Sequence, residues 1–291
     1  MKRFAVIGHP VAHSLSPLLH GKAYDLLRLD CSYESFDILP EALPAALRDF
    51  REQGFSGLNV TLPHKESIAK LVDTLTDEAR AVGAVNTLLV RGDRIAGDNT
   101  DVHGFAASVA SVRKSIEGRT VLLLGAGGSA RAVVYALLSR FKPSEIVVVN
   151  RDEDRGRDLL RHFADHAGDA KLTSGSVEPA ELSPLLDRAD LIVNCTSLGL
   201  SPAVEGCPVK DDTVFRPEQV VMDLIYTPLR TRLIALATKS GARTISGLEM
   251  FLHQGARSFE LWLGQPMPVD AIRPVIMNEL ERQQKESRQH P

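Results

Sequence analysis

The chain has 291 residues, of which 44% are hydrophobic and 24% charged, and a formal net charge of −3 at pH 7. This balance excludes a disordered or fibrous chain, and it provides no basic field that would collect nucleic acid. The three scattered cysteines form neither a disulfide framework nor a metal site, and no apolar run approaches the ~20 residues of a membrane span, so we expect a cytoplasmic protein.

In the first third of the chain, short apolar runs alternate with segments of helical periodicity. This alternation predicts a mostly parallel sheet covered by helices. The expected strands are 4–7, 33–38, 58–61, 84–90 and 94–97, the last two forming a hairpin, and the expected helices are 15–29 and 43–50.

A second series of elements starts near residue 119. The strand 120–124, an apolar stripe of helical spacing over 130–141 and the strand 146–149 form one βαβ unit. Further strands are expected at 191–194, 220–224 and 243–245, and helices at 159–166, 230–240, 247–263 and 268–284. We therefore predict an α/β protein with a Rossmann-type domain at 103–243 and a first domain at 1–102 plus 244–291, to which the last helices return.

A glycine-rich turn follows the strand 120–124. Residues 124–130 read Leu-Gly-Ala-Gly-Gly-Ser-Ala and fit the G-x-G-x-x-G/A fingerprint, in which small residues let a pyrophosphate approach the backbone at a helix N-terminus. A tight turn without a ligand is the structural alternative. The predicted cofactor-binding residues are Gly125, Ala126, Gly127, Gly128, Ser129, Ala130, Asn150, Arg151 and Arg155.

The end of the second Rossmann strand indicates which dinucleotide binds. An NAD site usually places an acidic residue there, whereas this chain has Asn150 and Arg151, with Arg155 one turn later. Guanidinium groups pair with phosphate, so this strand end favours the 2′-phosphate of NADP. Asp152 argues for NAD unless it caps the following helix, and use of both cofactors stays open.

Polar side chains cluster at element ends of the first domain, where α/β proteins assemble their sites. Hydride transfer between an alcohol and a nicotinamide needs a group that takes or supplies the hydroxyl proton, and a lysine beside a carboxylate can do this. We predict Lys65 and Asp101 as this pair, although a solvated surface lysine is the more ordinary case. Neutral partners for a polyhydroxylated, anionic substrate are predicted at Ser14, Ser16, Asn59, Thr61, Asn86 and Gln254, with helix caps and turns as the structural alternatives.

Six short motifs in order along the chain resemble those of the shikimate dehydrogenase family. They are H-S-L-S-P at 13–17, N-V-T-L-P-H-K at 59–65, G-A-V-N-T at 83–87, G-D-N-T-D at 97–101, D-L-I-Y-T-P at 223–228 and Q-G-A at 254–256. The resemblance covers nearly the whole chain, and the glycine-rich turn also matches that of the family.

The resemblance implies a reversible, NADP-linked reduction of 3-dehydroshikimate to shikimate, on the route to aromatic amino acids, in a cleft between the two domains. It implies that the serines of the first motif bind the substrate carboxylate, that Lys65 and Asp101 are catalytic, and that Tyr226 reaches the substrate. The implied protein is a monomer or homodimer with a small-molecule substrate and no nucleic-acid or membrane partner. Two positions depart from the family pattern: Asp152 replaces a threonine, and Gly21 replaces an asparagine.

Other functions remain open at this stage. A dual shikimate/quinate dehydrogenase is the main alternative, because a single extra hydroxyl is rejected only weakly unless the site is built against it. A folate-linked methylene dehydrogenase has a similar layout, but the paired serines and the G-x-N-T-D motif argue against it. A Rossmann-type sensor or repressor would be favoured by loss of Lys65 or Asp101, and both are present.

Overall fold

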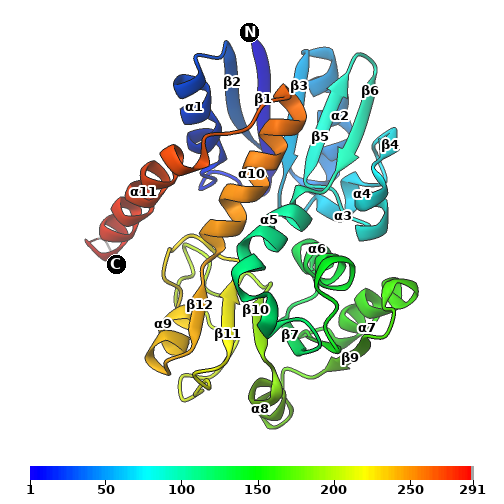
Figure 1. Ribbon diagram of the computed structural model, residues 1–291. Helices are drawn as coiled ribbons and strands as arrows, with labels where there is room; N and C mark the ends of the chain where they lie inside the picture. Colours follow the sequence, from blue (N-terminus) through cyan, green and yellow to red (C-terminus); the bar gives the residue numbers. More distant parts are fainter. Residues whose placement is uncertain (290–291) are drawn as a thin grey trace. The chain divides into compact units, whose positions relative to one another are not determined.

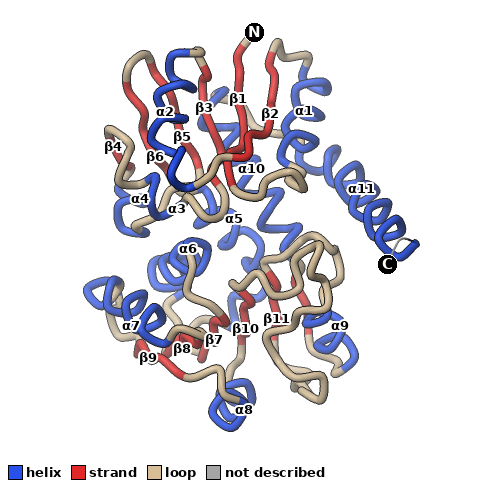
Figure 2. Tube along the Cα trace, turned by 180° about the vertical axis from the view of Figure 1, so that it is seen from behind, coloured by secondary structure: helices blue, strands red, loops and turns tan. Residues whose placement is uncertain are grey.

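Residues 1–289, the part of the chain that the computed structural model describes, form two units, each built on a six-stranded sheet (Figures 1 and 2). Unit 1 comprises Met1–Gly104 and Leu252–Ile276, and unit 2 comprises Phe105–Phe251 and the chain from Met277 onward. The two-domain α/β fold expected from the sequence is confirmed. The assignment of residues 244–291 to a substrate domain stays a prediction, because the units divide this segment at Leu252 and at Met277.

The sheet of unit 1 is mixed, with strand order β2-β1-β3-β5-β6-β4. β1 is parallel to β2 and β3, and β4 is parallel to β6, whereas β5 is antiparallel to β3 and β6. The sheet is mostly parallel, as expected, and only β5 runs against the other strands, because the two residues after it turn the chain back into the expected hairpin, with Gly92 at a φ of 57°. The strands are β1 (Lys2–Gly8), β2 (Cys31–Asp37), β3 (Phe55–Val60), β4 (Thr74–Leu75), β5 (Thr87–Arg91) and β6 (Arg94–Asp98).

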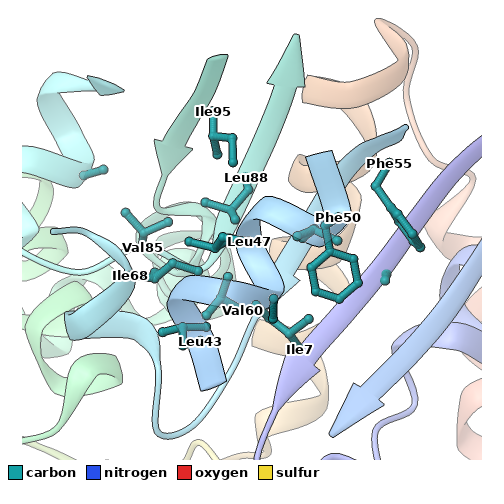
Figure 3. Packing of buried hydrophobic residues seen from close by; sticks show 14 residues of the cluster. Ile7, Leu43, Leu47, Phe50, Phe55, Val60, Ile68, Val85, Leu88 and Ile95 are labelled. Atoms are coloured by element: carbon teal, nitrogen blue, oxygen red, sulfur yellow. The ribbon is translucent and has the colours of Figure 1, made fainter. Parts of the chain in front are cut away.

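Helix α2 (Leu43–Glu52) shows how the sequence builds the core of unit 1. Leu43, Leu47 and Phe50 lie on one helical stripe, and they pack in one buried cluster with Ile7 of β1 and Val60 of β3 (Figure 3). Burial of this stripe, rather than helix propensity, holds the helix on the sheet.

Helix α10 (Gly247–Leu263) brings distant aromatic residues to the first strand of unit 1. Phe259 is fully buried, and the Trp262 ring stacks on Phe4 with the ring centroids 4.8 Å apart. Unit 1 therefore depends on a helix encoded about 150 residues after its sheet. The other helices that contribute to it are α1 (Ser16–Leu27), α3 (Lys65–Ile68), α4 (Asp77–Val82), the start of α5 (Thr100–Val109) and the start of α11 (Val269–Gln289), with a 3₁₀ turn at Pro40–Ala42.

The sheet of unit 2 is wholly parallel, with strand order β12-β11-β10-β7-β8-β9. This is the doubly wound Rossmann order, in which β7 comes first and the order reverses between β7 and β10. Its central strands are apolar except for one polar residue at one end of each, and they are almost wholly buried, as parallel strands require. The strands are β7 (Thr120–Leu124), β8 (Glu145–Val149), β9 (Lys171–Gly175), β10 (Leu191–Asn194), β11 (Val220–Asp223) and β12 (Arg243–Ile245).

The helices of unit 2 follow its strands. They are α6 (Gly128–Ala136) with a π-helical extension at Leu137–Phe141, α7 (Glu153–His162), α8 (Pro179–Arg188) and α9 (Arg232–Lys239), with 3₁₀ turns at Ala110–Ser115 and Ala164–His166. Among residues 1–289, no helix is both long and apolar enough to cross a membrane.

Candidate active site

Lys65 and Asp101 form an ion pair in unit 1. Lys65 is the first residue of α3 and Asp101 lies in the first turn of α5, and the Lys65 Nζ donates a hydrogen bond of 2.7 Å to Asp101 Oδ2. Both side chains are nearly buried, at 11% and 6% exposure. The alternative of a solvated surface lysine is therefore wrong, and the sequence prediction that brings these two residues together is correct. A buried ammonium held by one carboxylate oxygen has a fixed direction, as a proton-transfer group requires.

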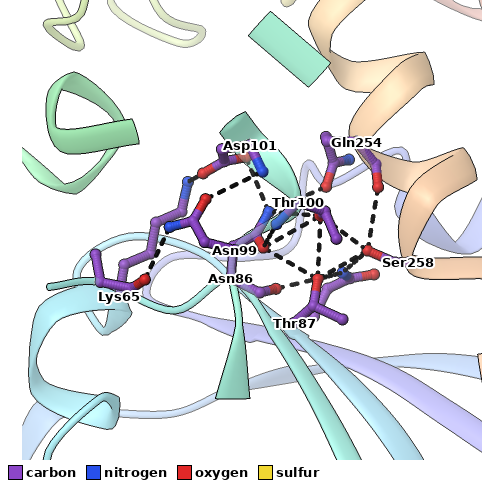
Figure 4. A network of polar contacts seen from close by, with 10 residues as sticks. Lys65, Asn86, Thr87, Asn99, Thr100, Asp101, Gln254 and Ser258 are labelled. Atoms are coloured by element: carbon purple, nitrogen blue, oxygen red, sulfur yellow. Dashed lines mark hydrogen bonds and ion pairs between the residues drawn. The ribbon is translucent and has the colours of Figure 1, made fainter. Parts of the chain in front are cut away.

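Asn86 holds the second carboxylate oxygen of Asp101. Its Nδ2 donates to Asp101 Oδ1 at 2.9 Å, and its Oδ1 accepts from the backbone N–H of Thr100 at 2.7 Å. The Asp101 backbone N–H donates to Asn99 Oδ1 at 3.1 Å, and the Asn99 amide in turn donates to Ala84 O at 2.8 Å. The carboxylate is thus fixed on both oxygens and at its own backbone (Figure 4).

Three buried hydroxyl groups lie behind Asn86. The Oγ atoms of Thr87, Thr100 and Ser258 are mutually within 2.8 to 3.1 Å. Asn59 joins the group, because its Nδ2 donates to Ser258 Oγ at 2.9 Å while its Oδ1 accepts from the Tyr33 hydroxyl at 2.7 Å. Asn59, predicted to touch the substrate, therefore has its amide nitrogen and its amide oxygen engaged inside the protein.

The remaining predicted substrate residues of unit 1 differ in their surroundings. Gln254 on α10 joins the network, because its Oε1 accepts from Asn86 Nδ2 at 3.4 Å. Ser14 precedes α1, and its Oγ accepts from the backbone N–H of Ser16 at 3.3 Å, whereas Ser16 itself is buried at the helix start. Thr61 follows β3, and its methyl group lies against Gly8, where an added Cβ would come within 2.4 Å. None of the hydrogen bonds described for residues 1–289 joins Ser14, Ser16 or Thr61 to the Lys65–Asp101 network.

The glycine-rich turn of unit 2 fits a dinucleotide. Gly125 has a φ of +108°, and a Cβ there would lie 2.9 Å from Thr196 Cγ2, so this turn from β7 requires glycine. Gly127 is the N-cap of α6, and a Cβ on it would meet no atom within 4 Å, which leaves open space at the helix N-terminus. Backbone N–H groups that face open space at a helix start suit a pyrophosphate. The residues present therefore fit the predicted cofactor.

The residues after β8 form the predicted ribose end of this site. Asp152 is the N-cap of α7, and its carboxylate accepts from the backbone N–H of Arg155 at 3.3 Å, so the helix-cap interpretation of Asp152 is correct. The Arg155 Nε donates to Ala126 O at 3.1 Å, which holds its guanidinium against the glycine-rich turn. The Asn150 Nδ2 donates to Asp152 O at 2.7 Å, and Arg151 is exposed.

Tyr226 lies in unit 2, in the loop between β11 and α9. Its ring stacks on Phe251, with the centroids 4.4 Å apart. The loop is closed by the buried carboxylate of Asp223, which accepts from the Ile225 backbone N–H at 3.0 Å and from the Thr231 hydroxyl at 2.7 Å. Burial raises the pKa of Asp223 to about 6.

Three family models match the chain. Residues 6–88 match a shikimate dehydrogenase substrate binding domain, residues 107–205 match a shikimate / quinate 5-dehydrogenase model, and residues 247–277 match a shikimate 5'-dehydrogenase C-terminal domain. Over 269 residues the chain is 41% identical to the shikimate dehydrogenase (NADP(+)) of Salinibacter ruber, an alignment that covers 92% of this chain and 94% of that relative. The chain belongs to the shikimate dehydrogenase family.

Solved structures agree with membership of the shikimate dehydrogenase family. The shikimate 5-dehydrogenase of Thermus thermophilus, solved with NADP(H) and shikimate, has a TM-score of 0.81 and 36% identity, covering 97% of this chain and 99% of that one. The quinate dehydrogenase of Corynebacterium glutamicum, solved with NAD, has a TM-score of 0.84 and 26% identity, covering 95% and 99%. The fold thus occurs in both a shikimate and a quinate dehydrogenase, and with either NADP(H) or NAD bound.

Sequence reasoning missed the residues that support the ion pair from behind. Thr87 and Thr100 stand inside recognised motifs but were not predicted as site residues, and Tyr33 and Ser258 stand outside every motif. Ser258 had one available signal: it lies four residues after Gln254, on the same face of a largely apolar helix.

Proposed function

We propose that this chain catalyses the reversible, NADP-dependent interconversion of 3-dehydroshikimate and shikimate, on the route to aromatic amino acids. The observation that carries the proposal is the buried pair of Lys65 and Asp101, 2.7 Å apart in a fixed polar network. The same chain carries a glycine-rich Rossmann turn that fits a dinucleotide. The 41% identical relative from Salinibacter ruber, a shikimate dehydrogenase (NADP(+)), and the matching family models support this reaction.

The proposed chemistry assigns the proton to Lys65. Bound NADP would supply the acceptor for the hydride of the alcohol carbon, and its reduced form would supply the donor in the reverse direction. The neutral amine form of Lys65 takes the proton of that hydroxyl during oxidation, and its ammonium form supplies the proton during reduction. Asp101 orients the Lys65 amine and balances its charge, because both side chains are almost out of solvent.

The rest of the substrate contacts combine the family resemblance with residue chemistry. Ser14 and Ser16 bind the substrate carboxylate and Tyr226 reaches the substrate, as the resemblance implies, and Thr61 and Gln254 are neutral partners for its hydroxyl groups. Asn59 and Asn86 serve mainly to shape the site, since both amides are bonded to protein groups.

The cofactor preference depends on two arginines. We propose that Arg151 and Arg155 bind the 2′-phosphate of NADP, with Asp152 engaged as a helix cap. Replacing Arg151 by alanine then raises the KM for NADP and leaves the KM for NAD nearly unchanged. An equal effect on both cofactors would contradict the assignment.

A dual shikimate/quinate dehydrogenase is the second candidate. The 26% identical quinate dehydrogenase solved with NAD favours it, as does Asp152 at the position where the family pattern has threonine. Steady-state kinetics with both acids and both cofactors separate the two. We expect the highest kcat/KM for shikimate with NADP. Comparable values for quinate would establish the dual enzyme, and no turnover of either acid would refute a dehydrogenase of this class.

The cellular setting is also proposed. We infer a cytoplasmic enzyme that acts as a monomer or homodimer on a small-molecule substrate, without nucleic acid. Light scattering during size-exclusion chromatography measures the oligomeric state directly, and a tetramer or larger assembly would contradict this inference.

A further inference from the structure

Ser258 is the most connected hydroxyl group of the buried network in unit 1. Its Oγ accepts from Asn59 Nδ2 at 2.9 Å, lies 2.8 Å from Thr87 Oγ1 and 3.1 Å from Thr100 Oγ1, and lies 3.1 Å from Gln254 O (Figure 4). Ser258 and Thr87 are fully buried, and Thr100 is 1% exposed. Water therefore has no ready route to replace a missing partner here.

The hydrogen-bonding capacity of a hydroxyl group limits how this cluster can be arranged. A serine hydroxyl donates one proton and accepts at two lone pairs. The Asn59 amide donates to Ser258, which leaves the Ser258 proton for Gln254 O or for one threonine. The Thr87 hydroxyl then has its proton to direct toward Asn86 Oδ1 at 3.0 Å. Thr100 Oγ1 lies 3.1 Å from Asn86 Oδ1 and 3.0 Å from Asn86 Nδ2, from which it accepts.

These bonds decide which way the Asn86 amide faces. Its Oδ1 accepts from the Thr100 backbone N–H at 2.7 Å and from the Thr87 hydroxyl at 3.0 Å, whereas its Nδ2 donates to Asp101 Oδ1 at 2.9 Å and to Thr100 Oγ1 at 3.0 Å. A flipped Asn86 amide would turn its oxygen toward the Asp101 carboxylate and its N–H groups toward backbone and hydroxyl donors. Such a flip leaves buried groups unsatisfied, which costs about 1–3 kcal/mol per group.

We propose that Ser258 is a positioning residue for the catalytic pair, acting through Thr87, Thr100 and Asn86 on the carboxylate of Asp101. This inference rests on the proposed function, because it assigns Ser258 a part in the reaction that Lys65 carries. The hydroxyl on α10 keeps Asn86 oriented, and Asn86 keeps Asp101 Oδ2 toward Lys65 Nζ. Ser258 does not touch the substrate in this scheme.

The test is a double-mutant cycle of Ser258→Ala and Asp101→Asn, measured as kcat for shikimate oxidation with NADP. Ser258→Ala alone lowers kcat by roughly 10–100-fold, as loss of a supporting hydrogen bond does at other sites. In the Asp101→Asn background the same change has little further effect, because the carboxylate it positions is gone. The KM for NADP, which binds in unit 2, stays unchanged.

Ser240→Ala is the matched control. The Ser240 hydroxyl also bonds the carbonyl four residues back, at 3.0 Å to Leu236 O, but Ser240 is the C-cap of α9 in unit 2 and is not among the residues of the network. We expect wild-type kcat from it. Active-site concentrations are set by NADP titration, so that a loss of folded protein is not counted as a loss of rate.

Each result of the double-mutant cycle either supports or overturns the role of Ser258. Equal loss of kcat from Ser258→Ala in both backgrounds, or no loss in the wild type, overturns the inference while leaving the proposed function intact. Absence of shikimate turnover in the wild type refutes the proposed function itself, and the inference with it. If Ser258→Ala does not fold, the cycle is run with Ser258→Cys, which keeps a side chain of similar shape and weakens its hydrogen bonds.

Discussion

At the scale of single residues, burial gives ordinary side chains unusual properties in both units. In unit 1 it removes water from the Lys65–Asp101 pair, so that protein groups alone set the direction of the ammonium. In unit 2 it makes the Asp223 carboxylate costly to ionise, although three protein groups donate to it. The fixed direction of the Lys65 ammonium serves the proposed chemistry. The cost of ionising Asp223 can be measured as a pH dependence of the unfolding free energy.

The pH dependence of stability provides a test of the Asp223 environment. Its pKa is raised from 3.8 to about 6, so the folded state binds this proton more tightly than the unfolded state does. The stability from this group is full below pH 3.8 and is lost as the pH rises through about 6. The whole shift corresponds to a free energy on the order of 3 kcal/mol.

Asp223→Asn has no charge to develop and does not lose this stability. We expect its unfolding free energy, relative to the wild type, to rise by about that amount between pH 4 and pH 7, measured by urea unfolding. The substitution also changes hydrogen bonds of residue 223. That contribution to the unfolding free energy is the same at pH 4 and at pH 7, so it cancels when the two values are compared. Asp169→Asn, at an exposed position, is the control. A pH-independent difference for Asp223→Asn would contradict the buried, costly carboxylate.

Short sequence motifs predict some residues of the candidate site but not others. Lys65 and Asp101 stand in short motifs at element ends, and the sequence analysis pairs them correctly. Ser258 could not be found in this way, because it lies 158 positions from Thr100 and only the packing of α10 brings the two hydroxyls together. Asn59 was recognised for its residue type, but its partners, Tyr33 and Ser258, depend on tertiary structure.

At the scale of secondary-structure elements, β3 and α10 approach each other closely in unit 1 at Gly57. A Cβ on Gly57 of β3 would lie 2.3 Å from Nε1 of Trp262, and that nitrogen donates to Leu88 O at 2.9 Å. The indole ring is rigid, so the clash cannot be relieved by a small rotation. The glycine is required here by close approach.

Two glycine-to-alanine substitutions should have opposite effects on stability. Gly57→Ala lowers the unfolding free energy by about 1–3 kcal/mol, because it forces Trp262 out of its position. Gly21→Ala, in the middle of α1 with no atom within 4 Å of an added Cβ, raises it by about 0.5–1 kcal/mol through helix propensity. Urea unfolding measures both. A neutral Gly57→Ala would show that the indole is free to move.

Most elements that bury a full apolar face could be predicted, although α5 and α8 were missed, and several short or polar elements were missed as well. The βαβ unit over 120–149 was found because its strands are wholly buried. β9 was missed because Lys171–Gly175 is a half-exposed edge strand with one large apolar side chain. α3 and α4 are four and six residues long, too short to show a periodic stripe.

At the scale of the whole molecule, the chain passes from unit 1 to unit 2 and back again. The alternation of strands and helices predicts two α/β domains, and the structure confirms this architecture. The one antiparallel strand of unit 1, β5, belongs to the hairpin that the sequence analysis predicts around Gly92. The position of α10 depends on side chains that fit the first sheet, such as Trp262 against Phe4.

The single tryptophan of the chain makes unit 1 separately observable. Trp262 packs on Phe4 in that unit, so its fluorescence follows the unfolding of unit 1. If shikimate binds the residues assigned to it there, a concentration of 100 times its Kd stabilises unit 1 by about 2.7 kcal/mol. We expect the fluorescence-detected urea midpoint to rise with shikimate and not with inositol, a ring polyol without a carboxylate. An unchanged midpoint with shikimate would place the acid elsewhere.

The central claim is that Lys65 moves the hydroxyl proton, and one comparison tests it most directly: kcat for shikimate oxidation by Lys65→Ala, beside the equilibrium Kd of the same variant for shikimate. The account predicts a kcat lower by roughly 10²–10⁴-fold, as expected for loss of a general acid–base group, with the Kd nearly that of the wild type. Turnover close to the wild-type rate would contradict it and remove Lys65 from the mechanism.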